Sequence, residues 1–284
     1  MSWWRTPSTW YAQQNPKGAR VRARGLRRDY SVRYIRHRDE VLPRLRRRLR
    51  PPARRPGATI VMVSFNSVSY LPGTIAMVRK HTDPSVRLLV VDNCSTDGTA
   101  EWLAANSVEA VLLRENIDHG RAMNVGWTRS ATEFTLSLDI DAFPIRPDWL
   151  DLVLPPLRSG YRVAGAFQDR AFVHPCWLAM ETERFFRRGH TFEDGHNWDT
   201  GELISWREYP ELHLIPLTSL RGPAWLGQVY GDAVYHNGYS TASFRIARGE
   251  ALDGKGPVVT KTAPAGDEPL RAWREALRRY GCEA

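Results

Sequence analysis

The sequence predicts an α/β fold in which a mostly parallel central sheet carries helices on both faces, preceded by a basic helical extension. Three observations support this prediction. Short apolar segments alternate with helical segments between residues 58 and 150. Several of these apolar segments run directly into Ser, Asn or Asp. Basic residues are concentrated ahead of this alternating pattern, in the first 57 positions.

The alternating segment accounts for most of the predicted sheet. Continuous apolar runs without polar alternation are typical of strands that are covered on both faces. Strands are predicted over residues 59–65, 87–92, 110–113 and 134–138, and helices over 70–80, 96–106 and 120–129. Because the strands alternate with helices, they are expected to run parallel and to bring their polar ends to one edge, where open sheets of this kind bind ligands.

The second half of the chain has a weaker pattern. A helix over residues 150–157, ended by Pro155-Pro156, and a strand over 161–167 are expected first. Residues 168–243 are rich in aromatics, His and Gly, which predicts loops and short strands. A final packing helix is indicated by Pro269 at its start, Gly281 at its end, and the apolar stripe Leu270, Trp273, Leu277 and Tyr280.

Composition narrows the class of protein. The 284 residues are 42% hydrophobic and 25% charged, as in ordinary globular proteins. The longest apolar run, near residues 60–65, is far short of the ~20 residues of a membrane helix. We find no targeting segment at the start of the sequence. Cys94, Cys176 and Cys282 are scattered, which favours a reducing cytoplasm.

The N-terminal extension carries the basic charge of the chain. Residues 1–57 hold 17 Lys and Arg but only 3 Asp and Glu, a net charge of +14, whereas the remaining 23 basic and 28 acidic residues amount to −5. Residues 29–50 have a helical apolar stripe that Pro43 is expected to kink or divide. Pro51, Pro52, Pro56 and Gly57 predict a linker to the body.

Three interpretations of this extension remain open. Residues 1–55 suit a basic amphipathic arm on anionic lipid headgroups, which would place the protein at the inner face of the membrane. They also suit a clamp on an anionic or nucleic-acid partner. The third interpretation is a flap that packs on the mildly acidic body of its own chain.

Asp139-Ile140-Asp141 is the clearest candidate for chemistry. The triplet follows the predicted strand 134–138, and alternate strand residues point to the same side. Two carboxylates held together repel each other unless a cation lies between them. Mg²⁺ and Mn²⁺ prefer carboxylate and phosphate oxygens. The triplet therefore predicts a divalent metal site, against the simpler alternative of a solvated turn.

A second polar segment, Asp92-Asn93-Cys94-Ser95-Thr96-Asp97-Gly98-Thr99, ends the strand 87–92. Asp92 is expected at the same edge as Asp139, where a carboxylate can accept hydrogen bonds from a nucleobase or a ribose. Ser64 and Asn66 end the first strand and are expected beside it. The simpler alternative is a plain strand–turn–helix junction, with Ser95 or Thr96 as the helix cap.

Residues 59–150 resemble the nucleotide-binding half of family 2 glycosyltransferases, which have the GT-A fold. The matching pieces are VSFNS at 63–67, VVDNCSTDGT at 90–99, Asn116 with AMNVG at 122–126, and LDIDAFP at 138–144. The sequence departs from this pattern at Asp118, where the family usually has Gly, which leaves the backbone shape of this loop open.

The resemblance implies an enzyme of the hexosyltransferase type that takes a sugar from a UDP, GDP or dTDP donor. It divides the chain into the extension and linker 1–57, a donor half 58–150, an acceptor half 151–265 and a C-terminal helix 266–284, the last three in one domain. Ser64 to Asn66 would border the nucleoside, Asp92 would bind the base, and Arg121 would cover the base or ribose. Asp139 would reach the ribose or metal, and Asp141 would bind Mg²⁺ or Mn²⁺.

The resemblance is looser in the acceptor half. Asp199 lies where many members carry a general base, and Glu202, Asp194 and Glu193 are the alternatives in the same acidic cluster. Trp177 and His174 lie in a segment that lines the acceptor side in the family. His236, followed by Asn237 and Gly238, matches a late His that often binds the metal or diphosphate in GT-A enzymes.

The expected reaction is an inverting transfer to an acceptor hydroxyl, with Asp199 as the base. A carbohydrate, a lipid-linked molecule or a natural product remains open as the acceptor. Two other classes compete with this one. A sugar-nucleotide pyrophosphorylase usually has a Gly-rich basic loop after its first strand, where this chain has Asn66-Ser67-Val68-Ser69. A nucleic-acid-binding protein would explain the arginines but not the strand-end carboxylates.

Overall fold

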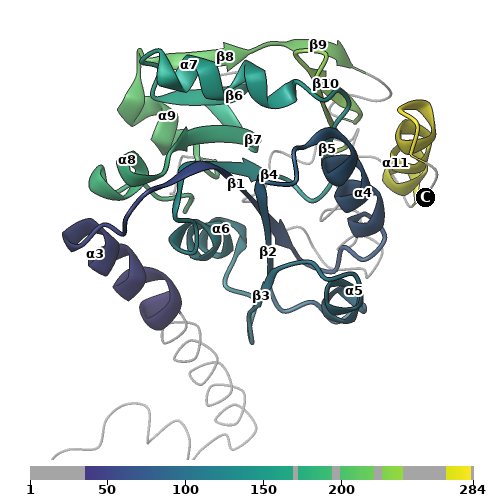
Figure 1. Ribbon diagram of the computed structural model, residues 1–284. Helices are drawn as coiled ribbons and strands as arrows, with labels where there is room; N and C mark the ends of the chain where they lie inside the picture. Colours follow the sequence, from purple (N-terminus) through teal and green to yellow (C-terminus); the bar gives the residue numbers. More distant parts are fainter. Residues whose placement is uncertain (1–35, 169–171, 194–198, 221–225, 239–266, 283–284) are drawn as a thin grey trace, which may run out of the picture.

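The computed structural model describes residues 36–168, 172–193, 199–220, 226–238 and 267–282, and these form an α/β domain built on two sheets (Figure 1). The larger sheet has the order β3-β2-β1-β4-β7-β6-β8. Its strands are β1 (Arg55–Ser64), β2 (Arg87–Asp92), β3 (Ala110–Leu112), β4 (Thr132–Leu138), β6 (Val163–Gln168), β7 (Phe172–Glu181) and β8 (Leu212–Ile215). The smaller, antiparallel sheet has the order β5-β11-β10-β9, with β5 (Ala142–Pro144), β9 (Leu217–Leu220), β10 (Gln228–Tyr230) and β11 (Val234–His236).

Four neighbouring strands of the large sheet, β3, β2, β1 and β4, run parallel, as the alternating pattern predicts. β7 is antiparallel to both of its neighbours, β4 and β6, whereas β6 and β8 are parallel to each other. The sheet is therefore mostly parallel with one reversed strand among those described, and all of its parallel strands from β1 to β4 end at the same edge.

Helices cover both faces of this sheet. In chain order, the described helices are the π-helix η1 (Arg36–Val41), α3 (Leu42–Leu49), α4 (Leu71–His81), α5 (Thr99–Ala105), α6 (His119–Thr128), the 3₁₀ helix η2 (Trp149–Leu152), α7 (Leu154–Arg158), α8 (Thr182–Arg187), α9 (Glu202–Glu208) and α11 (Glu268–Arg279). Apolar residues of α4, α5 and α7 pack on one face with Ile60 and Met62 of β1. Residues of α6, α8 and α9 pack on the other face with Val61 and Val63. Alternate β1 side chains thus enter two separate cores, which explains its unbroken apolar sequence.

α6 approaches β1 closely because Gly126 lies at the contact. A Cβ at this position would stand 2.3 Å from Cγ1 of Val61, so a larger residue would push the helix away from the sheet. This is the physical role of the last residue in the AMNVG segment. The tight packing sets the position of the N-terminus of α6, which lies beside Asp139 at the end of β4.

Three predicted boundaries are corrected. β1 begins at Arg55, inside the predicted linker, because residues 55–58 pair with β4. The expected helix 150–157 is a 3₁₀ turn followed by the short helix α7, and Pro155 lies in the first turn of α7 instead of ending the helix. β7 is a ten-residue strand in the interior of the sheet, where only loops and short strands were expected. Its burial on both faces removes the alternation by which a strand is recognised.

The C-terminal helix is found as predicted. α11 buries Pro269, Trp273, Ala276 and Leu277. It packs on Tyr70, the residue before α4, on Phe143 of β5 and on Tyr235 of β11, so it joins the small sheet to the start of α4. None of the helices in the described ranges is both long enough and apolar enough to span a bilayer.

The described part of the extension packs on the body through charged side chains. Arg47 is 7% exposed, and its Nη2 donates to Oε1 of Glu183 on α8 at 2.7 Å. Its Nη1 donates to the carbonyl of Ser130. Glu40 is fully buried and accepts hydrogen bonds from Arg44 at 2.9 Å and from Asn124 of α6 at 2.7 Å. Residues 36–50 therefore pack as a flap on their own body, which is one of the three interpretations above.

We expect Arg47→Met to destabilise the fold by about 3–5 kcal/mol, because it leaves Glu183 buried without its charged partner. The free energy of unfolding from urea titration measures this loss. The double variant Arg47→Met, Glu183→Met should recover most of it, since both charges are then absent. Arg46→Met is the matched control, because Arg46 directly precedes Arg47 in the same helix and its side chain is exposed. A small effect of Arg47→Met would mean that α3 does not dock through this pair.

Candidate active site

The ends of β1, β2 and β4 meet at one edge of the large sheet. Ser64 pairs with Asp92 in the parallel register, and the Asn93 N–H donates to the Ser64 carbonyl at 2.8 Å, so both strands end level. β4 ends at Leu138 on the other side of β1, directly before Asp139. The predicted convergence of Ser64, Asp92 and Asp139 at this edge is therefore present in the structure.

Two loops at this edge are tied together by side-chain hydrogen bonds. The Asn66 N–H donates to Oγ of Ser95 at 2.9 Å, and Oδ1 of Asn66 accepts from the Thr96 N–H at 2.8 Å. Asp97 accepts from the Val68 N–H at 2.9 Å. Asn66 has a φ of 51°, a conformation that Asn adopts more readily than most residues. These hydrogen bonds between residues 66–68 and 95–97 hold the two loops together at the edge.

Asp92 is 3% exposed and accepts a hydrogen bond from the hydroxyl of Ser95. Burial raises the pKa of Asp92 above its usual range, and the hydrogen bonds from Ser95 partly oppose this shift. A buried carboxylate at the end of a strand is suited to accept hydrogen bonds from a ligand that excludes water from it.

Asp139 and Asp141 lie in a turn between β4 and β5, not on a strand. The Ala142 N–H donates to the Asp139 carbonyl at 3.0 Å, which closes the turn. The turn is held from one side by the hydroxyl of Thr74, which donates to the Ile140 carbonyl, and from the other by the Asn237 N–H, which donates to the Asp141 carbonyl at 2.8 Å. The two carboxylates converge because of this turn, so the strand alternation expected from the sequence is not the cause.

His236 completes the cluster. β11 pairs with β5 so that His236 lies opposite Ala142, next to the turn. Nε2 of His236 is 3.5 Å from Oδ2 of Asp139 and 3.6 Å from Oδ1 of Asp141. One ligand atom from each of these three residues lies within 4.8 Å of the others. The structure therefore brings together the three residues predicted to bind a metal, although His236 is far from the other two in the sequence.

The electrostatics of this cluster favour a bound cation. Burial raises the pKa of Asp139 to about 7, an effect opposed by His236 and reinforced by the carboxylates of Asp141 and Asp199. Oδ1 of Asp139 is buried and has no hydrogen-bond partner among the described residues. Two carboxylates and an imidazole form a ligand set that Mn²⁺ or Mg²⁺ accepts, with positions left for phosphate oxygens. The residues present thus fit a divalent metal.

Two further histidines border the cluster. Nε2 of His119, the first residue of α6, is 3.7 Å from Oδ1 of Asp139. The ring of His174, on β7, is 5.8 Å from that of His236. Burial, with the nearby His236 and His119, lowers the pKa of His174 to about 3, so its imidazole is neutral. Nδ1 of His174 accepts the Cys176 N–H at 3.1 Å, which leaves the proton on Nε2.

Sequence reasoning missed His119, although the residue next to it carried a signal. Asp118 has φ 73° and ψ 158°, a backbone conformation that glycine adopts easily and other residues rarely do. Asp118 therefore has a positive φ although it stands where the family usually has Gly. This settles the backbone shape of the loop, which the sequence left open. That unusual conformation directs the chain into α6 and places His119 beside Asp139.

Arg121 is the third residue of α6, and two carboxylates hold its side chain. Its Nε donates to Oε1 of Glu193 at 2.8 Å, and its Nη1 donates to Oδ2 of Asp118 at 3.3 Å. Gly120 allows the backbone of the segment around Phe192 to pack against the helix, since a Cβ would stand 2.2 Å from the Phe192 carbonyl oxygen. These contacts anchor Phe192 and Glu193, which precede Asp199 and Glu202 in the chain.

Asp199 is exposed, and its carboxylate is close enough to affect the pKa of Asp139. Its N–H donates to Oε2 of Glu202 at 2.8 Å. Glu202 is 2% exposed and also accepts from Nε1 of Trp206 at 3.4 Å. Glu202, the first residue of α9, therefore holds the backbone of Asp199. The Asp199 side chain is exposed and accepts the Thr200 N–H at 2.8 Å. Asp194 lies outside the described residues.

The expectation for Trp177 is corrected. Its side chain is fully buried on β7 and packs against Trp149, with ring centroids 5.9 Å apart. It belongs to the core on the α4 side of the sheet and cannot stack on an acceptor. The error arose because β7 is buried along nearly its whole length, so its sequence does not show which side chains enter the core.

Comparison with known proteins defines the class. The family Glycosyl transferase family 2 matches residues 59–206, which span every element from β1 to α9, and the chain belongs to this family. The topology described above and this membership establish the GT-A type of α/β fold.

The individual relatives share little sequence identity with this chain. The chain is 28% identical over 92 residues to TuaG of Bacillus subtilis (strain 168), a proposed teichuronic acid biosynthesis glycosyltransferase, covering 31% of this chain and 36% of TuaG. The S. aureus TarS fragment 1–349 in complex with UDP-GlcNAc has 16% identity and a TM-score of 0.47, covering 58% of this chain and 59% of that chain. Glucosyl-3-phosphoglycerate synthase from Mycobacterium tuberculosis, in complex with Mn²⁺, UDP and glucosyl-3-phosphoglycerate, has 16% identity and a TM-score of 0.46, covering 56% and 69%. The chain thus spans about a third of the length of its curated relative.

Proposed function

We propose that this protein transfers a hexose from a nucleoside diphosphate sugar to an acceptor hydroxyl, with inversion and with a divalent metal. The observation that carries the proposal is the cluster of Asp139, Asp141 and His236 at the edge where buried Asp92 also lies. A carboxylate pair able to hold a metal ion, beside a buried carboxylate able to bind a nucleoside, suits a diphosphate-linked donor. Family membership supports the same class of reaction.

Each described residue has a defined task in this proposal. Asp92 accepts a hydrogen bond from the base, with Ser64 and Asn66 bordering the nucleoside. Asp139, Asp141 and His236 hold Mg²⁺ or Mn²⁺, which supplies charge neutralisation for the diphosphate when bound. Arg121 lies next to this region, and its ion pair with Glu193 keeps it beside the donor edge, where it would cover the base or ribose.

The transfer step assigns a proton acceptor to Asp199. Its carboxylate takes the proton from the acceptor hydroxyl as that oxygen bonds to the anomeric carbon. The bond from this carbon to the diphosphate breaks on the opposite face, and the electron pair leaves with the nucleoside diphosphate. His174, held neutral with its proton on Nε2, borders the acceptor side. Most of the acceleration would come from positioning and charge stabilisation.

The competing classes lack a comparable observation. A pyrophosphorylase-like nucleotidyltransferase has no support from the family match, and we do not propose nucleic acid as a substrate or partner. We propose a reducing cytoplasmic setting, because the three cysteines are free thiols. The donor base and the acceptor, whether carbohydrate, lipid-linked molecule or natural product, are left to experiment.

A thermal-shift screen tests the donor site. We expect one of UDP, GDP or dTDP to raise Tm by roughly 5–10 °C at 100 times its Kd, but only with Mn²⁺ or Mg²⁺ present, because binding at that ratio adds about 2.7 kcal/mol. The same nucleotide with EDTA is the control, as is the Asp92→Asn variant with metal, in which a weaker shift is expected. Equal stabilisation with Mn²⁺ and with EDTA would contradict a metal-bridged diphosphate, and no response to any nucleotide would contradict the donor class.

A further inference from the structure

The segment formed by η1 and α3 presents an apolar stripe to the outside of the molecule. Val41, Leu45 and Leu49 are spaced four residues apart, so they lie on one side of the helical segment. Their exposed fractions rise along the helix, at 38%, 51% and 72%. The side facing the body is instead charged, since Glu40 and Arg47 are the buried residues there. An ordinary surface helix has the reverse arrangement.

Arginines flank this stripe on both sides. Arg46 and Arg48 lie beside the leucines around the helix, and Arg50 follows directly after it; all three are exposed. We refer to Val41, Leu45, Leu49, Arg46, Arg48 and Arg50 as the α3 face. In an amphipathic helix that lies in a membrane interface, apolar side chains enter the acyl boundary and basic ones contact the headgroups.

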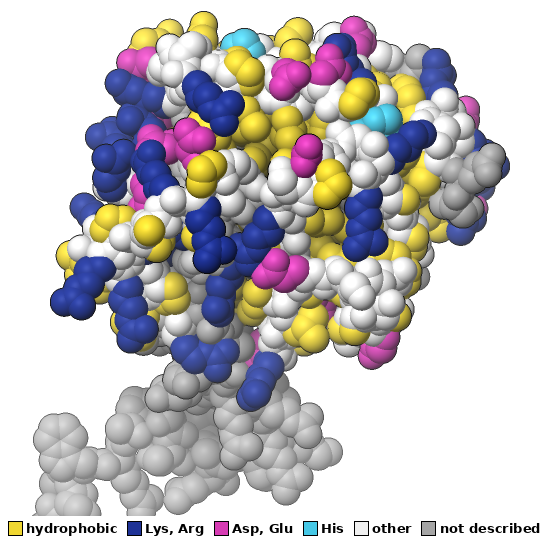
Figure 2. Space-filling view, viewed as in Figure 1, with side chains coloured by type: hydrophobic (Ala, Val, Ile, Leu, Met, Phe, Trp, Pro, Cys, Tyr) yellow, Lys and Arg dark blue, Asp and Glu magenta, His cyan; other side chains and the backbone are white. Residues whose placement is uncertain are grey.

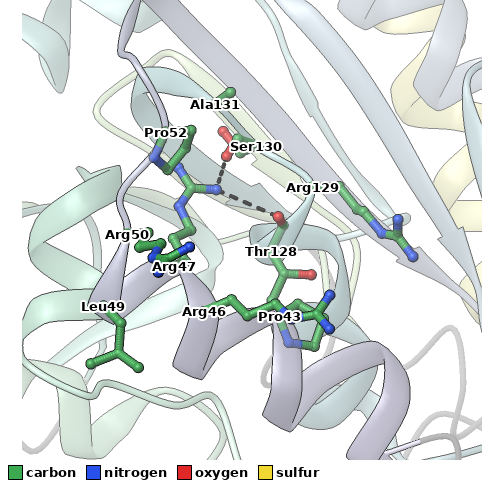
Figure 3. A pocket seen from close by; sticks show the side chains of 10 residues that line it. All are labelled: Pro43, Arg46, Arg47, Leu49, Arg50, Pro52, Thr128, Arg129, Ser130 and Ala131. Atoms are coloured by element: carbon green, nitrogen blue, oxygen red, sulfur yellow. Dashed lines mark hydrogen bonds between the residues drawn. The ribbon is translucent and has the colours of Figure 1, made fainter.

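A hollow of about 600 Å³ opens at the C-terminal end of α3 (Figure 3). One wall is formed by the helix, through Pro43, Arg46, Leu49 and Arg50, and the other by the turn 128–131 between α6 and β4. Arg47 crosses from the helix to that turn, donating to the Ser130 carbonyl, and closes the hollow on the inside. Guanidinium groups beside a leucine suit a phosphodiester whose acyl chains stay outside the hollow.

The basic surface continues beyond α3. α8 packs against α3 through the Arg47–Glu183 pair, and its end carries Arg187 and Arg188, whose side chains are 62% and 54% exposed. Figure 2 shows Lys and Arg side chains gathered along the side of the molecule that carries α3 and α8. α11 lies on the opposite side of the domain in Figure 1.

We propose that the α3 face and the adjoining hollow bind the surface of a bilayer that contains anionic phospholipids. Charge complementarity and the outward apolar stripe together favour this partner. A nucleic acid would satisfy the arginines but would leave Leu45 and Leu49 in contact with water or phosphate. The proposal does not depend on sugar transfer, since its residues lie apart from the metal cluster. It assigns a membrane role to the part of the extension that also packs on the body.

Co-sedimentation of the full chain with vesicles tests the proposal. We expect binding to vesicles of phosphatidylcholine with phosphatidylglycerol and little binding to phosphatidylcholine alone. The variant Arg46→Gln, Arg48→Gln, Arg50→Gln should lower partitioning to the anionic vesicles by about 100-fold, at about fivefold for each charge. Leu45→Ser, Leu49→Ser should also lower it by at least roughly tenfold, because the apolar contact with the bilayer is lost.

Matched controls separate this surface from the rest of the chain. Leu112→Ser on β3 and Arg274→Gln on α11 remove exposed residues of the same types elsewhere and should bind like the unchanged protein. Unchanged Tm of all variants shows that they fold. Residues 1–35 remain in every variant, so vesicle binding that survives both α3 variants would overturn the proposal.

Other occupants give different outcomes, and each would also overturn the proposal. Binding of duplex DNA or single-stranded RNA that is lost in the arginine variant, without vesicle binding, would identify a nucleic acid. Loss of vesicle binding in millimolar inorganic phosphate at constant ionic strength would identify a simple phosphate site. A dimer by light scattering that dissociates in Leu45→Ser, Leu49→Ser would identify a second copy of the chain.

Discussion

Replacing Asp141 by Asn is expected to lower kcat/KM for sugar transfer by about 1,000-fold or more. Asp141 lies with Asp139 and His236 in the three-residue cluster, and its carboxylate is 5% exposed. Loss of this ligand removes several kcal/mol of charge stabilisation from the departing diphosphate, and each 1.36 kcal/mol corresponds to tenfold in rate. Steady-state kinetics across a Mn²⁺ titration measure the effect, which should appear as lost activity and as weaker activation by metal.

The same substitution should leave the metal-free protein at least as stable as before. The charge of Asp141 raises the pKa of the buried Asp139, so removing it relieves repulsion between two carboxylates. Tm without metal is therefore expected to stay constant or rise, which separates a metal role from a folding role. Asp151→Asn, at an exposed carboxylate on η2, is the control and should have unchanged kinetics. Full turnover of Asp141→Asn in EDTA would exclude the metal assignment.

Replacing Asp199 by Asn is expected to lower kcat by roughly 10²–10⁴-fold while leaving nucleotide binding intact. The amide retains the size of the side chain but cannot take the proton of the acceptor hydroxyl. The thermal shift produced by nucleotide and Mn²⁺ should match that of the unchanged protein, because Asp199 is assigned no contact with the donor. Single-turnover kinetics with a bound donor distinguish the lost chemical step from weaker donor binding.

Glu202→Gln provides the matched comparison for Asp199. The glutamine carbonyl oxygen can still accept the Asp199 N–H, so the loop is held and most of the activity should remain. Asp199→Asn and Glu202→Gln therefore have opposite expected results, although the two carboxylates are three residues apart. Unchanged turnover of Asp199→Asn together with loss in Glu202→Gln would move the base to Glu202. Normal activity in both variants would direct the search to other acceptor-side carboxylates.

The meeting of Ser64, Asp92 and Asp139 at one edge was predictable, because each lies at the end of a strand whose type is evident from local sequence. Asp92 ends a continuous apolar run, and parallel strands bring such ends to one edge. The cluster of Asp139, Asp141 and His236 was predictable only in part. The pairing of β11 with β5 that brings His236 to Asp139 and Asp141 is not encoded in any local periodicity, and the family resemblance alone indicated it.

The errors have a common physical origin. Trp177 and its strand β7 are buried on both faces, so neither side of the strand is marked by polar residues. His119 was missed because its position depends on the positive φ of Asp118, and the only sequence signal for that conformation is the Gly that the family usually has there. Glu202 and Asp199 carry the same functional group, and only burial in the structure distinguishes the carboxylate that holds the loop from the exposed one.

The sequence by itself determined the class of fold, the edge at which the site lies, and the carboxylates Asp92, Asp139 and Asp141, because these follow from short-range alternation and strand ends. Tertiary structure decided which distant residues join them, His236 and His119 above all, and which face of α3 turns outward. Those outcomes depend on contacts between segments far apart in the chain, such as Arg47 with Glu183 and Asn237 with Asp141. Local sequence propensity does not encode such pairs, which form only when packing of the core brings the segments together.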